Sequence, residues 1–414
     1  MKPKRVLACA LLLLGASMAH GATLHWIASW GASPAPPRTA MGPLPPTPGF
    51  DDVTIRQIVR ISAGGKYVRV RFTNEYGSKP LVIGAASIAR ASASGKVQPG
   101  TRHVLTFGGK RNAVIPAGAP LLSDPVDLPV KALSSLAIIL YLPRDTGPCT
   151  CHPTAMQIGY VSPRGNFTGK LFKAARTITS RAFLSEVDVK VTGPARAIVA
   201  FGDSITDGYG STADTNRRWP DRLAERLVSR GGRTTLSVVN EGISGNRVLA
   251  DGAGQSALAR FDRDVLAVPG AAYVIVFEGI NDIGFSYGHF TGPLAKALKH
   301  LTAGPKVTAQ ALIAGYRQLI ARAHLHGLKI YGATITPYEG SATYTAQGNA
   351  VRDAVNRWIR TSGAFDGVLD FDAVLRDPGD PNRIAPALQA GDHIHGNDAG
   401  YAALAKSIDL VPFE

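Results

Sequence analysis

The sequence predicts two regions of different fold class, an all-β sandwich followed by an α/β domain with a parallel sheet. Two observations carry this prediction. Residues 51–191 contain many short apolar or alternating runs separated by Gly and Pro, without long helical periodicity, which is typical of a β-sandwich or jelly roll. From Arg196 onward, strand-like apolar runs alternate with amphipathic helical patterns, which is typical of parallel βαβ units with helices on both faces of the sheet.

The first 22 residues have the pattern of a signal peptide. Three basic residues precede the short apolar stretch 6–14, and small residues follow through Ala22. We therefore expect residues 1–22 to be removed and the protein to be secreted or periplasmic. No later run reaches the roughly 18 apolar residues of a membrane span, so no integral membrane segment is expected after cleavage.

Residues 23–192 are expected to form the N-terminal β-sandwich domain. A proline-rich segment over residues 33–48 predicts extended chain on the surface. The clearest strand is 66–73, where apolar and polar residues alternate as in a half-buried strand. Further strands are expected at 26–30, 53–61, 81–89, 103–107, 121–128, 135–141, 156–161 and 183–191.

Residues 193–414 are expected to form the second domain, because the pattern changes at Thr192-Gly-Pro194. Strands are expected at 197–201, 234–239, 273–277, 329–335 and 368–371, and helices at 219–230, 256–265, 308–326, 345–360 and 397–408.

The net charge of +15 at pH 7 is spread along the chain, without a block of five like charges. Nucleic-acid binders usually cluster their basic residues and interleave aromatics, so no nucleic-acid partner is expected. A solvated basic surface is favoured over attraction to acidic glycans or an anionic envelope surface.

Cys149 and Cys151 are the cysteines that remain after the signal peptide. Two residues apart on a strand, they face the same side, and both a strained disulfide and free thiols stay open. His152 follows directly, but one Cys-x-Cys-His without a second ligand cluster is a weak metal signal, so no metal site is expected.

Ser204 lies where a strand of the predicted parallel sheet ends, within the stretch Phe-Gly-Asp-Ser-Ile-Thr-Asp-Gly. Ligands of such sheets bind at this edge, so Ser204 is a candidate nucleophile. Asp392 and His395 lie three residues apart in a loop before the last helix, so the carboxylate can hold one imidazole nitrogen while the other faces the serine. His393 is the alternative base, and Asp203 is interpreted as a structural hydrogen-bonding residue.

Two further loops follow neighbouring strands. Asn240-Glu-Gly-Ile-Ser-Gly-Asn246 follows the second strand, and Gly279-Ile-Asn-Asp282 follows the third. Parallel strands bring these ends to one edge of the sheet. We expect an oxyanion hole made of the backbone N–H groups of Ser204 and Gly242 and the side-chain amide of Asn281.

Taken in order, these four blocks resemble the SGNH/GDSL hydrolase superfamily over about residues 196–409. The resemblance implies a flavodoxin-like sheet and an ester hydrolase without a metal or organic cofactor. It also implies Ser204 as nucleophile, His395 as base and Asp392 as its partner.

The segments Gly147-Pro-x-x-x-His-Pro153, Tyr160-Val-Ser162 and Arg218-Trp-Pro-Asp221 resemble a two-domain bacterial branch of that superfamily likened to xylan esterases. In that branch a β-sandwich precedes the hydrolase. The resemblance suggests an O-acetylated glycan as the substrate.

Gly284-Phe-Ser-Tyr-Gly288 matches the G-x-S-x-G elbow of α/β-hydrolases and makes Ser286 a rival nucleophile. The elbow must itself be the turn between strand and helix, whereas residues 278–283 intervene here. Ser286 is therefore disfavoured.

Residues 284–300 are instead expected to form an insertion that makes one wall of the site. Tyr287, His289 and Phe290 are candidate contacts to a sugar or acyl group, and a self-packed loop is the alternative. His152 from the sandwich is a further candidate at the rim of the site.

The expected function is that of a secreted serine esterase that cleaves carboxylic esters, foremost acetyl esters of carbohydrates, through an acyl-enzyme. The alternatives on the same triad are an acyltransferase and a broad-specificity short-chain or lipid esterase. A non-catalytic glycan-binding protein is a third alternative, against which the four intact blocks argue.

Overall fold

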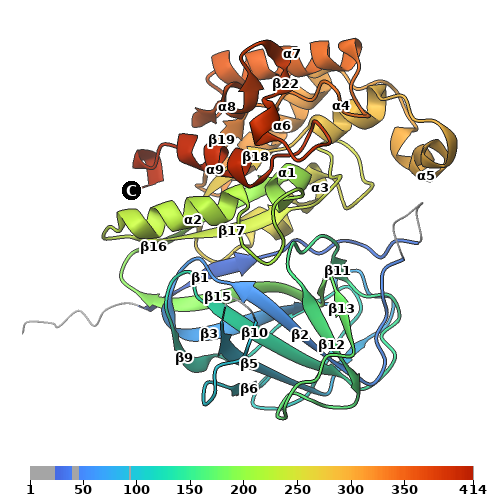
Figure 1. Ribbon diagram of the computed structural model, residues 1–414. Helices are drawn as coiled ribbons and strands as arrows, with labels where there is room; N and C mark the ends of the chain where they lie inside the picture. The colour runs from blue at the N-terminus through green and yellow to red at the C-terminus, as the bar shows by residue number, and fades with distance from the viewer. Residues whose placement is uncertain (1–23, 40–45, 93–94, 414) are drawn as a thin grey trace, which may run out of the picture.

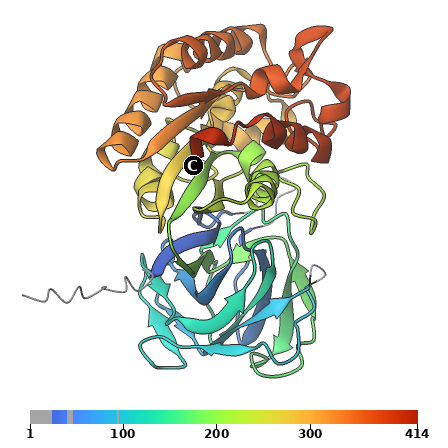
Figure 2. The same cartoon turned by 90° about the vertical axis from the view of Figure 1, so that its left-hand side faces the viewer.

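The computed structural model describes residues 24–39, 46–92 and 95–413, so the expected signal peptide lies outside the described residues. Figures 1 and 2 show two bodies stacked on each other, one built of β-strands and one in which helices surround a sheet. No helix in the described part of the chain is long and apolar enough to cross a bilayer.

The β-rich body contains two main antiparallel sheets. One has the order β1-β15-β3-β8, with β9 also paired to β3, and the other has the order β13-β12-β2-β10-β5-β6. Val70 of one sheet and Ile138 of the other belong to a single apolar core, which makes the pair of sheets a sandwich, as the sequence predicted. The strands are β1 (Leu24–Gly31), β2 (Val53–Arg60), β3 (Gly65–Thr73), β4 (Leu81–Ile83), β5 (Ala85–Ala91), β6 (His103–Leu105), β7 (Ala113–Ile115), β8 (Pro120–Leu122), β9 (Val126–Val130), β10 (Ser135–Leu142), β11 (Cys151–His152), β12 (Gly159–Arg164), β13 (Arg176–Ile178), β14 (Arg181–Ala182) and β15 (Leu184–Thr192).

The second body holds a five-stranded parallel sheet of order β17-β16-β18-β19-β20. Counted along the chain this is 2-1-3-4-5, the order of flavodoxin, so the predicted fold class is confirmed. The central strand β16 reads Ala-Arg-Ala-Ile-Val-Ala-Phe-Gly and is buried over its last six residues, because helices cover both faces of the sheet. The strands are β16 (Ala195–Gly202), β17 (Thr235–Gly242), β18 (Ala271–Phe277), β19 (Lys329–Ala333) and β20 (Gly367–Leu369), with a small hairpin of β21 (Arg376–Asp377) and β22 (Asp380–Ile384).

The helices differ from the expected set in several places, since α1 and α8 were not expected and α8 begins at the end of the strand expected at 368–371. The expected helix 256–265 is a short α-helix followed by a π-helical turn at Asp262–Leu266, and α4 and α5 occupy the region expected to be an insertion. The helices of the described chain are α1 (Ser204–Asp207), α2 (Trp219–Arg230), α3 (Ala257–Phe261), α4 (Ile280–Tyr287), α5 (Gly292–Thr302), α6 (Ala309–Leu325), α7 (Ala346–Thr361), α8 (Phe371–Leu375) and α9 (Asp398–Ser407), with short 3-10 turns at Pro386–Leu388 and Val411–Phe413.

The chain passes from the sandwich to the parallel sheet between Thr192 and Ala195. The first segment of the sandwich lies against the second body, where the Ala28 N–H donates to the Pro269 carbonyl oxygen at 2.9 Å. Beyond β1 the chain follows the junction of the two bodies (Figure 1). Residues far apart in the sequence therefore meet at the edge of the parallel sheet.

Of the two alternatives left open for the cysteines, the structure has the disulfide between Cys149 and Cys151. Among the residues that the structure describes, no cluster of His, Cys, Asp or Glu has the arrangement of a metal site.

Candidate active site

Ser204 lies at an abrupt change from strand to helix. β16 ends at Gly202 and α1 begins at Ser204, with the Asp203 carboxylate capping the helix through the Ile205 N–H at 2.9 Å. A side chain at position 202 would bring its Cβ within 2.2 Å of the Phe277 carbonyl oxygen, so only glycine fits. Burial raises the pKa of Asp203 to about 7, which agrees with a structural role for this residue.

Three of the predicted residues lie in line at this edge of the sheet. His395 Nε2 lies 2.7 Å from Ser204 Oγ, and His395 Nδ1 lies 2.6 Å from Asp392 Oδ2. The other Asp392 oxygen accepts the backbone N–H groups of Ile394 and His395 at 3.1 and 3.0 Å. Burial opposes ionisation of Asp392, but the hydrogen bonds from His395 and the backbone outweigh it and lower its pKa to about 2. The carboxylate is therefore ionised at neutral pH.

His393 does not reach the serine. Its backbone has φ of +63°, and its ring packs so closely on Gly340 that a Cβ there would lie 2.9 Å from it. The nearest polar side-chain contact of its Nδ1 is Gln389 Nε2 at 3.4 Å. Of the two candidate bases, the structure thus brings His395 to Ser204.

Two of the expected oxyanion donors are well placed. Ser204 is the first residue of α1, so its N–H has no acceptor within the helix. Asn281, in the first turn of α4, lines the same cleft as Ser204 and His395. Its Nδ2 donates one hydrogen to the Asn246 carbonyl oxygen at 3.0 Å, which fixes the amide and leaves its second hydrogen for a ligand.

The prediction that Gly242 supplies the third donor is wrong. Its N–H donates to Asn240 Oδ1 at 3.0 Å, and its α-carbon packs so tightly on α1 that a Cβ would lie 2.3 Å from the Asp207 nitrogen. Gly245, three residues later, lines the cleft with φ of +80°. Within the described chain its N–H makes no hydrogen bond. Gly242 and Gly245 lie in the same loop, and the sequence pattern alone does not show which N–H is free to bind a ligand.

The rival nucleophile Ser286 lies inside α4, and its Oγ accepts the Val307 N–H at 2.8 Å. The neighbouring Tyr287 hydroxyl donates to the Val307 carbonyl oxygen at 2.8 Å. Both side chains therefore fasten α4 to the segment before α6.

The expected substrate contacts from residues 284–300 are corrected in detail. Tyr287, His289 and Phe290 are absent from the described lining of the cleft, and Phe290 packs against the Phe285 ring, with 6.3 Å between ring centroids. Phe285 lines the cleft instead, and Lys296, Leu298 and Leu301 of α5 join it. The region does form a wall of the site, but from one face of α4 and from α5.

His152 does not lie at the rim. It is only 4% exposed, and both ring nitrogens contact protein oxygens, among them Asp207 Oδ1 at 3.1 Å. The expectation of a substrate contact is therefore wrong, because the ring is enclosed at the junction of the two bodies.

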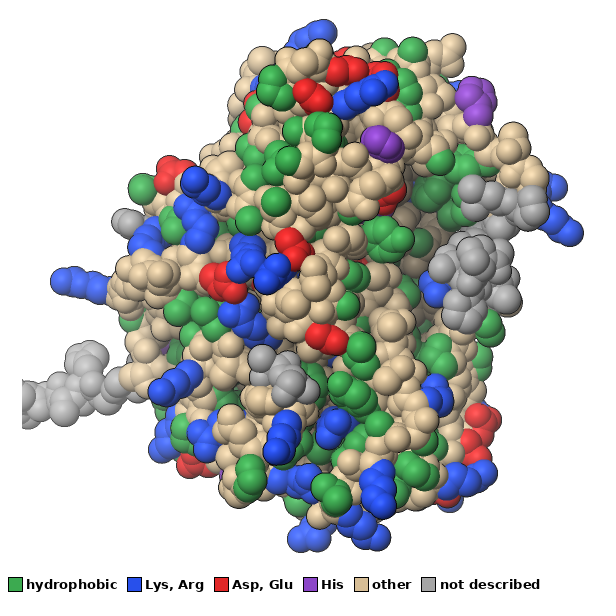
Figure 3. Space-filling view, viewed as in Figure 1, with side chains coloured by type: hydrophobic (Ala, Val, Ile, Leu, Met, Phe, Trp, Pro, Cys, Tyr) green, Lys and Arg blue, Asp and Glu red, His purple; other side chains and the backbone are tan. Residues whose placement is uncertain are grey.

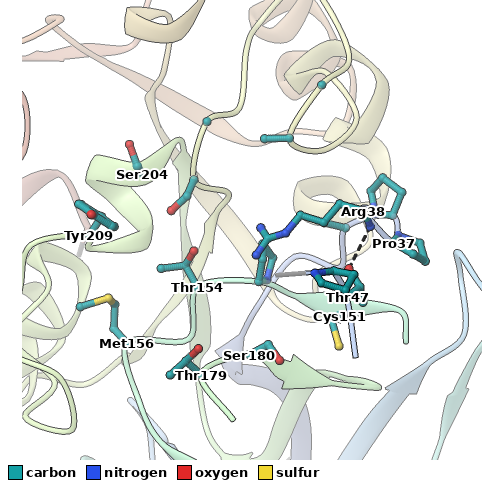
Figure 4. Close-up of a pocket in the computed structure, with 18 of the residues that line it drawn as sticks. Pro37, Arg38, Thr47, Cys151, Thr154, Met156, Thr179, Ser180, Ser204 and Tyr209 are labelled. Carbon is teal, nitrogen blue, oxygen red and sulfur yellow. Dashed lines mark hydrogen bonds between the residues drawn. The ribbon is translucent and has the colours of Figure 1, made fainter. Parts of the chain in front are cut away.

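The cleft around Ser204 has a volume of about 1430 Å³ and is lined by both bodies. Figure 4 shows Ser204 and Tyr209 on one side and Thr154, Thr179 and Ser180 of the β-rich body facing them. In Figure 3 the surface is hollowed between the two bodies, and Lys and Arg side chains are scattered over this face. The described lining includes Arg38 and Lys296 but no Asp or Glu.

Among solved structures, the chain is similar to a variant of Axe2, an acetyl xylan esterase from Geobacillus stearothermophilus, with 23% identity over 52% of this chain and 93% of that one and a TM-score of 0.38. It is also similar to a lipase/acylhydrolase from Enterococcus faecalis, with 19% identity, 51% and 92% coverage and a TM-score of 0.37. A member of the lipolytic G-D-S-L family from Veillonella parvula has 19% identity, 51% and 95% coverage and a TM-score of 0.36. No curated protein matches the chain.

The model of the GDSL-like lipase/acylhydrolase family matches residues 200–403, which contain all four sequence blocks and the line from Ser204 to Asp392. This part of the chain therefore belongs to the SGNH/GDSL hydrolase family, and the protein is a carboxylic ester hydrolase.

Proposed function

We propose that the protein is a secreted serine esterase that removes acyl groups, foremost acetyl groups, from carbohydrates. The observation that carries the catalytic part is the line of Ser204, His395 and Asp392, with contacts of 2.7 and 2.6 Å. Secretion is proposed from the signal-like pattern of residues 1–22.

In this mechanism Ser204 Oγ attacks the ester carbonyl carbon while His395 Nε2 takes the serine proton. The imidazolium that forms is stabilised by the Asp392 carboxylate. Collapse of the tetrahedral intermediate expels the alcohol, which takes the proton from His395 and leaves the acyl group on Ser204. Water then attacks the acyl-enzyme with His395 again as the base, and the carboxylic acid leaves.

The negative oxygen of both tetrahedral intermediates requires donors that are already oriented. We assign this role to the N–H groups of Ser204 and Gly245 and to the second hydrogen of the Asn281 amide. Gly245 replaces the Gly242 of the sequence prediction.

The size and lining of the cleft support a carbohydrate as the alcohol part. Its volume of about 1430 Å³ exceeds the roughly 300–1,000 Å³ typical of small-molecule sites. Hydroxyl and amide groups of Thr154, Gln157, Thr179 and Ser180 line the side contributed by the β-rich body and can bond to sugar hydroxyls. The acetyl group is proposed from the resemblance of residues 147–153 to the xylan-esterase-like branch.

A second candidate is a broad-specificity esterase for longer acyl chains. Phe285, Leu298 and Leu301 form an apolar wall near Ser204, and such a wall favours an alkyl chain over a sugar.

The test measures acetate release from acetylated xylan and other acetylated polysaccharides beside hydrolysis of p-nitrophenyl esters from C2 to C12. We expect the C2 ester and an acetylated polysaccharide to be preferred. A preference for C8 or longer would replace the proposal by the second candidate. Appearance of an acetylated sugar when a free sugar acceptor is added would reassign the protein as an acyltransferase.

Matched variants test the residue roles. Ser204→Ala should abolish hydrolysis while Ser286→Ala retains it, and His395→Ala should abolish it while His393→Ala retains it. Unchanged hydrolysis by Ser204→Ala would remove the nucleophile assignment. Amino-terminal sequencing of protein from the culture medium or periplasm tests the cleavage expected between Ala19 and Ala22.

A further inference from the structure

His152 is a buried residue of the β-rich body whose ring reaches into the hydrolase body. It belongs to β11, directly after the Cys149–Cys151 disulfide, and is 4% exposed. Its Nδ1 lies 3.1 Å from the Ser33 carbonyl oxygen. Its Nε2 lies 3.1 Å from both the Thr154 carbonyl oxygen and Asp207 Oδ1.

All three partners of the ring are hydrogen-bond acceptors. A hydrogen on Nε2 can therefore be donated to Asp207 Oδ1. The carboxylate among these partners is Asp207, which is completely buried. The ring thus provides the donor that a buried carboxylate requires.

Asp207 connects this ring to the loop that holds Gly245. It is the last residue of α1, and its second oxygen, Oδ2, accepts the Ser244 hydroxyl at 2.6 Å and the Ser244 N–H at 3.2 Å. Ser244 directly precedes Gly245, and both line the cleft. One buried carboxylate therefore holds the loop on one side and is itself held by His152 on the other.

We propose that His152 is a positioning residue through which the β-rich body orients the oxyanion loop of the hydrolase body. The inference rests on the proposed function and adds to it a role for the N-terminal region. When the His152 donor is lost, the Asp207 carboxylate moves toward other donors and takes Ser244 with it. The Gly245 N–H then points away from the developing oxyanion, so kcat falls and KM changes little.

Two amide replacements of His152 separate positioning from a simple tie between the bodies. In His152→Gln the side-chain NH₂ occupies the place of Nε2 and still donates to Asp207. In His152→Asn the NH₂ occupies the place of Nδ1, donates to Ser33 and leaves Asp207 without its donor. We expect kcat to stay within about fivefold for His152→Gln and to fall by about 10- to 100-fold for His152→Asn, as for a misplacement of up to about 1 Å.

Tyr76→Phe is the matched control. The Tyr76 hydroxyl also joins the two bodies, donating to Gln255 Oε1 at 2.7 Å and accepting from Arg263 at 2.6 Å, but none of these contacts involves Asp207. This variant should keep kcat within about twofold. Equal kcat for the Gln and Asn variants, or an Asn variant within threefold of wild type, would overturn the proposal.

A second variant, Ser244→Ala, tests the same proposal if His152→Asn does not fold. Ser244→Ala breaks the contact with Asp207 Oδ2 from the other side, and we expect its kcat to fall while KM stays within about twofold; an unchanged kcat would count against the proposal. Hydrogen exchange of the 243–247 peptide should quicken in Ser244→Ala and stay slow in His152→Gln. If wild type hydrolyses no faster than Ser204→Ala, the proposed function fails, and this exchange pattern alone then decides the role of His152.

Discussion

Replacing Asn281 by alanine tests the oxyanion hole most directly. The proposed hole has three donors, and Asn281 is the one whose donor sits on a side chain. Its amide is held in place because one hydrogen is bonded to the Asn246 carbonyl oxygen at 3.0 Å. Because the second hydrogen is oriented before the substrate arrives, its hydrogen bond to the oxyanion should stabilise the transition state without a further cost of ordering the side chain. Loss of one such donor costs about 2.7–4 kcal/mol, so kcat should fall by about 100- to 1,000-fold.

The structural cost of Asn281→Ala should be small in comparison. Asn246 loses one partner on its carbonyl oxygen, but its side chain still donates to the Gln255 carbonyl oxygen at 2.7 Å and accepts from Arg260 at 2.8 Å. Loss of one ordinary hydrogen bond lowers the free energy of unfolding by about 1 kcal/mol. Thermal unfolding should therefore shift by only a few degrees while the rate falls sharply.

Steady-state hydrolysis of p-nitrophenyl acetate measures this prediction, with kcat and kcat/KM expected to fall together because the contact forms only in the transition state. Asn281→Asp is the matched variant, since it keeps the shape and removes the donor, and it should lose at least as much activity. A raised KM with unchanged kcat, or a loss of less than fivefold, would refute the assignment of Asn281.

Three further predictions concern groups around the site. Asp392→Asn should lower kcat by about 10,000-fold without unfolding the protein, because the amide favours the wrong tautomer of the catalytic histidine; steady-state kinetics checks this. Burial raises the pKa of Glu241 to about 8, so the folded chain keeps a proton that the unfolded chain releases above its ordinary pKa. The free energy of unfolding should fall as pH rises from about 4.5 to 8, by at most about 1.4 kcal/mol per pH unit for this group, and Glu241→Gln should flatten that slope in urea titrations. The cysteines of the Cys149–Cys151 disulfide are two positions apart, so its closed ring is short, and replacing both by serine should lower the free energy of unfolding in urea by only about 2 kcal/mol.

The sequence predicted correctly those parts of the fold and of the site that depend on the pattern of neighbouring residues in the chain. The alternation of apolar strands and amphipathic helices after residue 196 gave the parallel sheet, because burial on both faces requires continuous apolar runs such as that of β16. Ser204, Asp392 and His395 could be selected because each occurs in a short polar block at a strand end or before a helix.

The errors arise where the direction of a group depends on more than residue type. Gly242 and Gly245 differ in their surroundings, because the Gly242 N–H donates to Asn240 Oδ1 whereas Gly245 lines the cleft with φ of +80°. Phe285 lies four residues after Asn281 on α4 and so shares its face, whereas Tyr287 does not. Had a helix been predicted after Gly279, the same spacing would have selected Phe285.

The contacts of His152 could not be predicted from the sequence, because they join residues of different bodies.

The hydrogen bonds of Ser33, which also cross from one body to the other, limit how far the two bodies can move apart. Glu241, near the end of β17, accepts the Ser33 hydroxyl at 2.6 Å, and the fully buried Arg260 donates to the same hydroxyl at 3.1 Å. Separating the bodies would take the Ser33 hydroxyl away from both buried side chains, and a buried polar group left without its hydrogen-bond partner costs about 1–3 kcal/mol. Interfaces between domains of one chain are usually polar, and here the side chains that hold Ser33 are also buried. We therefore expect the cleft to keep its shape during turnover, with substrate entering between fixed walls rather than through a hinge.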